Sequence, residues 1–297
     1  MQNNTTQKAR LIMVVIMILS GILLLSVLPI GVMNAADTVI EGAYKKYEIL
    51  KLPLIVTAPN MVKIFFPFWA GLSMMAGAAL FFLAVPVYRG EKWGRPLALG
   101  MLAIPCVTGA YILGPIIYFA SSSIIISIAY MGIGLISYFA ILLGEQSPTI
   151  TKIKNFVFFA LLGVTIAYTF ANAHTAFRMQ WAMYLTDPKA MDHAYVLGIV
   201  LGFIGVAVTI IGLPLLAGRT NAGWWVTTIG TATMLVGVLQ FFIGHTAISE
   251  FWIGTAMCFV TIILLVLPSV GGTLVDRPAK EQKYIPTLNP ISNNINL

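Results

Sequence analysis

The stretch LIMVVIMILSGILLLSVLPIGVM, residues 11–33, decides the fold class of this chain. It holds 23 residues without a charged side chain, and roughly 20 apolar residues suffice for an α-helix to cross a bilayer. Lys8 and Arg10 precede it, as in a signal peptide, but the apolar core of a signal peptide is shorter, at roughly 7–15 residues. We therefore expect an uncleaved first membrane-spanning helix.

Comparable apolar runs occupy almost the whole chain. The 297 residues are 59% hydrophobic and 9% charged, with a mean hydropathy of +0.92, whereas soluble domains carry roughly 25% charged residues. The runs predict an all-α fold, a polytopic transmembrane helix bundle of about eight spans in contact with the lipid bilayer. The predicted spans lie near residues 11–33, 61–88, 96–119, 121–144, 153–182, 193–218, 222–247 and 249–270.

The distribution of basic residues predicts the orientation. An even number of spans places both termini on one side, and a cytoplasmic N-terminus gives that side the larger share of lysine and arginine, as the positive-inside rule requires. We expect an integral membrane protein of a prokaryotic plasma membrane, with both termini inside. The net charge of +7 then belongs to short loops, so no nucleic acid is expected as a partner. The basic residues on the predicted inner side are Lys8, Arg10, Arg89, Lys92, Arg95, Lys152, Lys154, Arg219, Arg277, Lys280 and Lys283.

The sequence predicts a single transmembrane bundle over residues 1–274. Residues 275–297 have no apolar period and include three prolines, so we expect a flexible C-terminal tail there. Two outer loops are expected, at 34–60 and 183–192. The spacing of Glu41, Lys45 and Glu48 indicates a short interfacial helix in the first loop, before Pro53. A cofactor, if the protein binds one, belongs to residues 153–270, because the first four spans contain no histidine.

All three histidines of the chain lie near the predicted outer ends of helices. His174 comes late in the fifth span and His245 at the end of the seventh. These spans run in the same direction, so the two imidazoles are expected at similar depth. His193 opens the sixth span beside Asp192, at the same membrane face.

The seventh span carries two candidate inward faces. Thr227, Thr231 and His245 lie on one stripe at helical spacing, and we expect this stripe to face the protein interior because polar groups are costly in hydrocarbon. A neighbouring line of small and polar residues, which includes Gly237 and Gln240, competes for the same position.

Three readings of the histidines stay open. His174 and His245 could ligate a b-type haem from two sides, with Arg178 pairing with a propionate. The three histidines, His174, His193 and His245, could instead bind copper or zinc together with the carboxylate of Asp192 or Glu250. In the third reading no cofactor is bound and the histidines form structural hydrogen bonds.

These features favour a membrane-embedded subunit of a redox complex, of electron-transfer or oxidase and oxygenase type, with a histidine-bound cofactor near the outer face. Other membrane or peripheral subunits are expected as partners, and the outer aromatic residues would also suit a quinone. The alternative is a non-catalytic structural or transport-type subunit whose histidines are structural. No charged residue lies at mid-membrane, which disfavours an ion-coupled transporter.

Overall fold

The protein is a bundle of long α-helices, and the prediction of an all-α polytopic fold is confirmed. The computed structural model describes residues 6–51, 55, 57–145, 147–187, 192–244 and 249–275, and this part of the chain contains no strand. The helices are α1 (Gln7–Leu25), α2 (Val27–Leu50), α4 (Ala58–Arg89), α5 (Gly94–Phe119), α6 (Ile124–Leu143), α7 (Thr149–Thr186), α8 (His193–Ala217), α9 (Asn221–Gly244), α10 (Ser249–Val266) and the short α11 (Pro268–Gly271).

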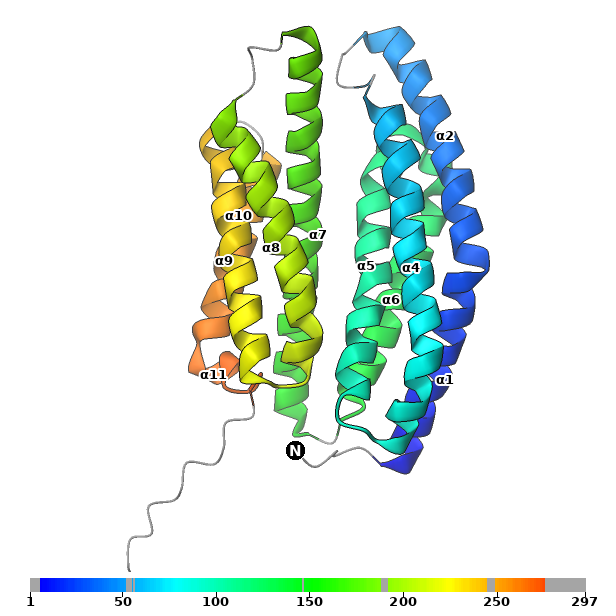
Figure 1. Cartoon of the computed structure of the whole chain (residues 1–297), viewed down its shortest axis with the longest axis vertical. Helices are drawn as coiled ribbons and strands as arrows, with labels where there is room; N and C mark the ends of the chain where they lie inside the picture. The colour runs from blue at the N-terminus through cyan, green and yellow to red at the C-terminus, as the bar shows by residue number, and fades with distance from the viewer. Residues whose placement is uncertain are drawn as a thin grey trace, which may run out of the picture.

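Seven helical segments in the described part are long and apolar enough to cross a membrane, with α1 and α2 taken as one segment of 44 residues. The eighth predicted span corresponds to α10, whose described apolar part, Phe251–Val266, is shorter. The protein is therefore a membrane helix bundle, and the number of crossings stays a prediction. Both ends of the described chain lie at the same end of the bundle, as expected for an even number (Figure 1).

The first helix does not end where the hydropathy pattern predicts. The sequence indicated an end near residue 33 and a loop over 34–60, but α2 follows α1 after the single residue Ser26 and continues to Leu50. Lys45 Nζ donates to Glu41 Oε1 at 2.6 Å, one turn away, so the charged residues of this segment support the helix. The helix predicted from the spacing of Glu41, Lys45 and Glu48 is present, but it continues the first span and is not a short separate helix within a loop. A charge marks where a helix leaves hydrocarbon and not where it ends.

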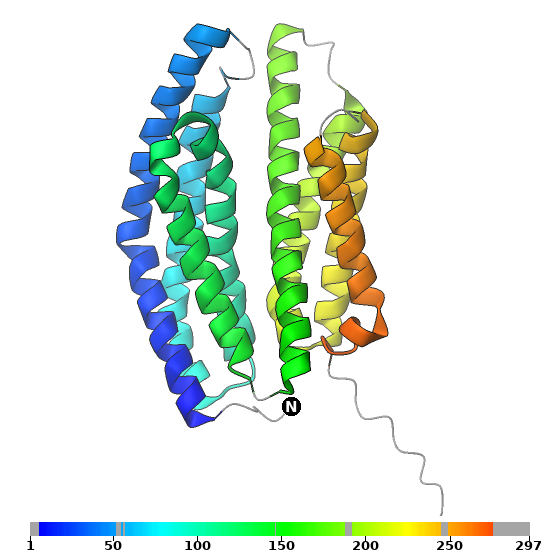
Figure 2. The same cartoon turned by 180° about the vertical axis from the view of Figure 1, so that it is seen from behind.

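The helices form two groups side by side. The first contains α1, α2, α4, α5 and α6, and the second contains α7 to α11; Figures 1 and 2 show the two groups from opposite sides, with α7 next to the first group. We call the end at which α2 and α7 terminate the outer end, following the predicted orientation. The prediction of a single bundle over residues 1–274, followed by a C-terminal tail, stays a prediction.

Small residues bring α8 and α9 into backbone contact. A Cβ added to Gly237 on α9 would lie 2.7 Å from the backbone nitrogen of Gly202 and 2.9 Å from the carbonyl oxygen of Gly198, both on α8. In the first group, hydroxyl pairs join helices instead: Ser20 to Ser137, and Ser73 to Thr108, each at 2.8 Å. Close packing and hydroxyl contacts are the usual means of helix association in a bilayer.

The two groups meet along α5, α7 and α8. At the inner end, Glu145 after α6 pairs with Arg95 of α5 at 3.2 Å and with Arg219 after α8 at 3.5 Å. Each of these side chains is less than one-fifth exposed. Farther out, a Cβ on Gly100 of α5 would lie 3.0 Å from the ring of Pro214 on α8. The outer part of this interface contains the candidate site.

Candidate functional site

His174 lies on the face of α7 that meets the first group of helices. Its side chain is buried, at 6% exposure, and its Nε2 lies 3.3 Å from the hydroxyl of Tyr111 on α5. The rings of Phe65 on α4 and of Tyr111 each stand edge-on to the imidazole, with centroids 5.2 Å away. The described contacts of His174 are therefore with α4 and α5.

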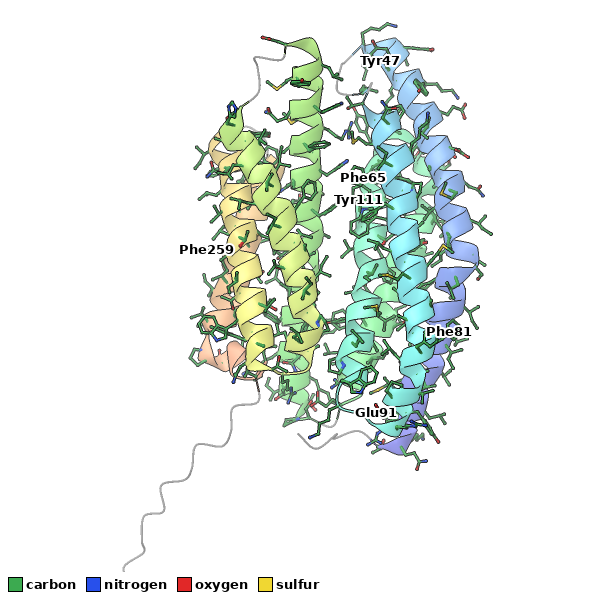
Figure 3. All side chains as sticks on the ribbon, in the orientation of Figure 1. Tyr47, Phe65, Phe81, Glu91, Tyr111 and Phe259 are labelled. Carbon is green, nitrogen blue, oxygen red and sulfur yellow. The ribbon has the colours of Figure 1, made fainter. Side chains whose placement is uncertain are left out.

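An aromatic cluster surrounds this histidine at the interface. We use the name interface cluster for Phe65, Trp69, Tyr111, Phe170, His174 and Phe203. Phe170 lies one turn before His174 on α7, with its ring centroid 5.0 Å from that of Trp69 and 5.2 Å from that of Phe203. Figure 3 shows Phe65 and Tyr111 on the side of the first group that faces α7. Rings from α4, α5, α7 and α8 therefore pack together in the outer half of the interface.

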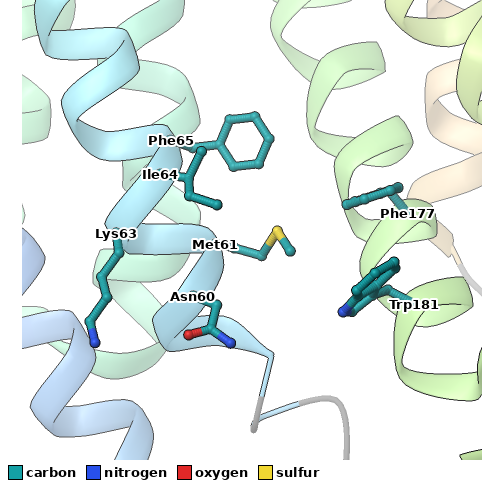
Figure 4. A pocket seen from close by; sticks show the side chains of 7 residues that line it. All are labelled: Asn60, Met61, Lys63, Ile64, Phe65, Phe177 and Trp181. Carbon is teal, nitrogen blue, oxygen red and sulfur yellow. The ribbon is translucent and has the colours of Figure 1, made fainter. Parts of the chain in front are cut away.

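A pocket of about 610 Å³ that is open to the protein surface lies beside the cluster, between α4 and α7, and we refer to it as the cavity. In Figure 4, Met61 and Phe65 on α4 face Phe177 and Trp181 on α7 across this space. Asn60, Lys63 and Ile64 complete the lining. Phe65 belongs to both features: it lines the cavity and also contacts His174 and Tyr111. It therefore separates the cavity from the histidine–tyrosine pair.

Stacked rings continue from the cavity towards the outer end of α7. Phe177 and Trp181 are stacked with centroids 6.3 Å apart, and Trp181 and Tyr184 with centroids 6.0 Å apart. These residues recur every three or four positions, so they share one face of α7. Trp181 is 42% exposed, and the wall of the cavity therefore reaches the protein surface.

Arg178 also lies at the interface of the two groups. It is half-buried one turn beyond His174, within electrostatic reach of the hydroxyl groups of Tyr111 and Tyr118 on α5. The pairing of Arg178 with a haem propionate stays a prediction.

Asp192 and His193, the predicted metal ligands at the start of α8, are exposed, whereas His174 is buried. Asp192 caps this helix: its Oδ1 accepts hydrogen bonds from the backbone nitrogens of Ala194 at 2.9 Å and Tyr195 at 3.3 Å. His193 is exposed. His245 lies outside the described residues, so its convergence with His174 stays a prediction. Among the residues that the structure describes, no three His, Cys, Asp or Glu side chains are grouped so that they could hold a metal ion.

The predicted inward stripe of α9 is buried wherever the structure describes it. Thr227 and Thr231 have no exposed surface, and Met234, Val238 and Phe241 continue the buried line. The prediction is confirmed for the two threonines. The competing line is buried at Gly237 and half-buried at Gln240, so it also faces neighbouring helices.

A further polar face of α7, which carries Thr165 and Thr169, packs against α10. Thr165 lies 3.0 Å from Thr261 Oγ1, and Thr169 lies 3.5 Å from the sulfur of Cys258. Thr165 and Thr169 are fully buried. The polar residues of this face therefore make interhelical contacts within the second group, away from His174.

Tyr111, Phe65 and Trp69 were not predicted as site residues, because the first four spans lack histidine. These three side chains lie in the second and third spans; Phe65 and Tyr111 contact His174, and Trp69 contacts Tyr111. A tyrosine within an apolar span is a usable signal, because a buried hydroxyl needs a hydrogen-bond partner. The identity of that partner depends on which helices pack together.

No protein-family model matches this chain, and no curated protein or solved structure shows significant similarity to it.

Proposed function

We propose that this chain is a membrane-embedded subunit of a redox complex and that the cavity between α4 and α7 binds the head group of a lipid-soluble quinone. The observation that carries the proposal is the position of an aromatic-lined cavity next to the buried His174–Tyr111 pair. A prokaryotic plasma membrane, with the cavity in its outer half, is the expected location.

The lining suits a flat ring with an apolar tail. Five of the seven lining side chains are apolar or aromatic: Met61, Ile64, Phe65, Phe177 and Trp181. The volume of about 610 Å³ falls within the range of roughly 300–1,000 Å³ found for small-molecule sites. Ile64 and Trp181 are exposed at the surface, so a long isoprenoid chain could leave the cavity between α4 and α7 into lipid.

The polar groups behind Phe65 suit the ring oxygens of a quinone or quinol. The hydroxyl of Tyr111 and Nε2 of His174 lie 3.3 Å apart, and a phenol and a neutral imidazole can each donate or accept a hydrogen bond. Oxidation of a quinol to a quinone releases two protons and two electrons, and the protons would pass to the outer aqueous phase. The electrons would pass to a one-electron carrier on a partner subunit, which is the reason for proposing a complex.

The haem, copper or zinc predicted from the sequence is a second proposal. A metal ion bound to His174 Nε2 would displace the contact of that nitrogen with Tyr111, and this observation favours the quinone. An absorption spectrum and metal analysis of the purified protein distinguish the two. A Soret band that His174→Gln or His245→Gln removes would replace the quinone proposal with haem, and bound copper or zinc lost in these variants would replace it with a metal site.

Quenching of tryptophan fluorescence tests the quinone site. The full chain in detergent micelles is titrated with a naphthoquinone that carries a short alkyl tail. We expect saturable quenching, reduced in Trp181→Phe because this ring lines the cavity. Trp225→Phe is the matched control, since Trp225 lies on α9 and is exposed on another surface. Quenching that rises linearly without saturation, or that is equally strong in Trp181→Phe, would contradict the proposal and favour a structural or transport-type subunit.

A further inference from the structure

The indole of Trp69 is a buried hydrogen-bond donor at the inner edge of the interface cluster. Its side chain is 5% exposed, and its Nε1 has no hydrogen-bond partner among the residues that the structure describes. Buried polar atoms are nearly always paired, so an exception requires an explanation. The cost of such an exception is higher within a membrane, where water is absent.

The position of Trp69 relates it to the cavity. It follows Phe65 by one turn of α4, on the same face, and Phe65 lines the cavity. Its ring centroid lies 5.8 Å from that of Tyr111 and 5.0 Å from that of Phe170. Trp69 therefore lies deeper than Phe65, next to the same tyrosine that contacts His174.

Phe65 is placed to control access to this deeper space. It is only half-buried, and one side of its ring borders the cavity. A rotation of its side chain away from both the cavity and Tyr111 would connect the cavity with the space next to Tyr111 and His174. A flat ligand could then lie between α4 and α7 with one end near Trp69.

We propose that Trp69 Nε1–H donates a hydrogen bond to an oxygen acceptor at the inner end of the ligand, which for the proposed quinone is a ring carbonyl. The inference rests on the proposed quinone site and adds the group that selects its ligand. Trp69 thereby makes the site specific for rings that carry a carbonyl oxygen. A hydrocarbon ring of the same shape leaves this donor without an acceptor and binds less tightly.

The test compares two ligands and two variants. Binding of an alkyl naphthoquinone and of the matching alkyl naphthalene to the full chain is measured by equilibrium dialysis, and the carbonyl stretch of the bound quinone is measured by isotope-edited infrared spectroscopy. We expect Trp69→Phe to bind the quinone roughly 3- to 10-fold more weakly, the factor that corresponds to one hydrogen bond. We also expect its carbonyl stretch to move towards the higher frequency of the free quinone. The naphthalene should bind equally to wild type and Trp69→Phe, and Trp225→Phe should match the wild type in every measurement.

A measurement on the wild type covers the case in which Trp69→Phe does not fold. The chain has six tryptophans. Replacing each of the other five in turn identifies their indole ¹⁵N–¹H resonances, and the remaining resonance belongs to Trp69. It should shift downfield with the quinone and stay in place with the naphthalene.

Two results would overturn the inference and separate it from the proposed function. If the quinone binds saturably but neither the Trp69 resonance nor the affinity of a folded Trp69→Phe variant changes, the site stands and the Trp69 assignment fails, with the indole N–H directed at the ring of Phe170. If the wild type binds no quinone saturably, both proposals fail.

Discussion

At the scale of single residues, two of the three histidines lie in contrasting environments. His174 is buried against Tyr111 and Phe65, whereas His193 is exposed at the start of α8. We expect His174→Gln to weaken quinone binding roughly tenfold or less, because one hydrogen-bonding group at the inner end of the site is altered. The matched variant His193→Gln should bind like the wild type. The dissociation constants of both variants from the quenching titration check this, and equal loss in the two would contradict a site at His174.

His174 could be predicted as a site residue from the sequence, whereas its neighbours Tyr111 and Trp69 could not. The pattern of histidines correctly drew attention to His174, since one imidazole among apolar residues is conspicuous. The direction in which the His174 side chain points could not be predicted from the fifth span, because small and polar residues occur on more than one face of that helix. Tyr111 and Trp69 become neighbours of His174 only once α4 and α5 pack against α7, and no local pattern encodes that pairing.

At the scale of helices, the contact between α8 and α9 depends on glycine. Gly237→Ala would place a Cβ 2.7 Å from the backbone of Gly202, and backbone cannot move aside as a flexible side chain can. We expect a loss of about 1–3 kcal/mol in stability, as for overpacked cores, seen as a lower midpoint of thermal unfolding in detergent.

Gly163→Ala on α7 is the control for this substitution. A Cβ there meets nothing within 4 Å, and alanine is preferred to glycine in a helix interior by up to about 1 kcal/mol. This variant should be as stable as the wild type or more so. A Gly237→Ala protein with an unchanged midpoint would show that α8 and α9 separate more readily than their packing implies.

Hydropathy predicts where the helices lie, but it does not predict where the first of them ends. All eight predicted spans correspond to helices, because a run of about 20 apolar residues has few alternatives in a bilayer. The helix of the first span continues to Leu50, 17 residues beyond the predicted end of that span at residue 33, through the segment where a short separate helix was expected. No proline interrupts residues 34–50, and the Glu41–Lys45 pair favours continued helix. The boundary of the membrane and the boundary of the helix are separate properties of this segment.

At the scale of the whole molecule, Glu145 is the carboxylate that joins the two groups at the inner end. Glu145→Gln would leave Arg95 and Arg219 close together and largely buried without their shared counter-charge. Removing one partner of a buried ion pair costs about 3–5 kcal/mol, and partial exposure reduces this to about 2 kcal/mol here. Thermal unfolding should show the loss, whereas Glu48→Gln, at an exposed position on α2, should not. Equal stability of the two variants would mean that the ion pairs do not hold the groups together.

The orientation of the bundle can be tested with single cysteines. In a background with Cys106 and Cys258 replaced by alanine, a cysteine at Glu48 lies at the outer end of α2 and one at Asn221 at the inner start of α9, and both positions are exposed. A membrane-impermeant maleimide added to intact cells should label position 48 and leave position 221 unlabelled. Labelling of position 221 alone would reverse the orientation and place the cavity at the cytoplasmic face.

The division into two groups of consecutive helices also has a consequence for biogenesis. The described residues between 6 and 145 make up the first group and those between 147 and 275 the second, so the whole of the first group is translated before the second. The first group can insert and pack while α7 is still in the ribosome, since its helices contact one another along their lengths. The contacts of His174 with Phe65 and Tyr111 form only after α7 has entered the membrane. A nascent chain arrested before residue 149 therefore lacks one wall of the cavity, so the proposed quinone should bind only after the insertion machinery has released most of the polypeptide.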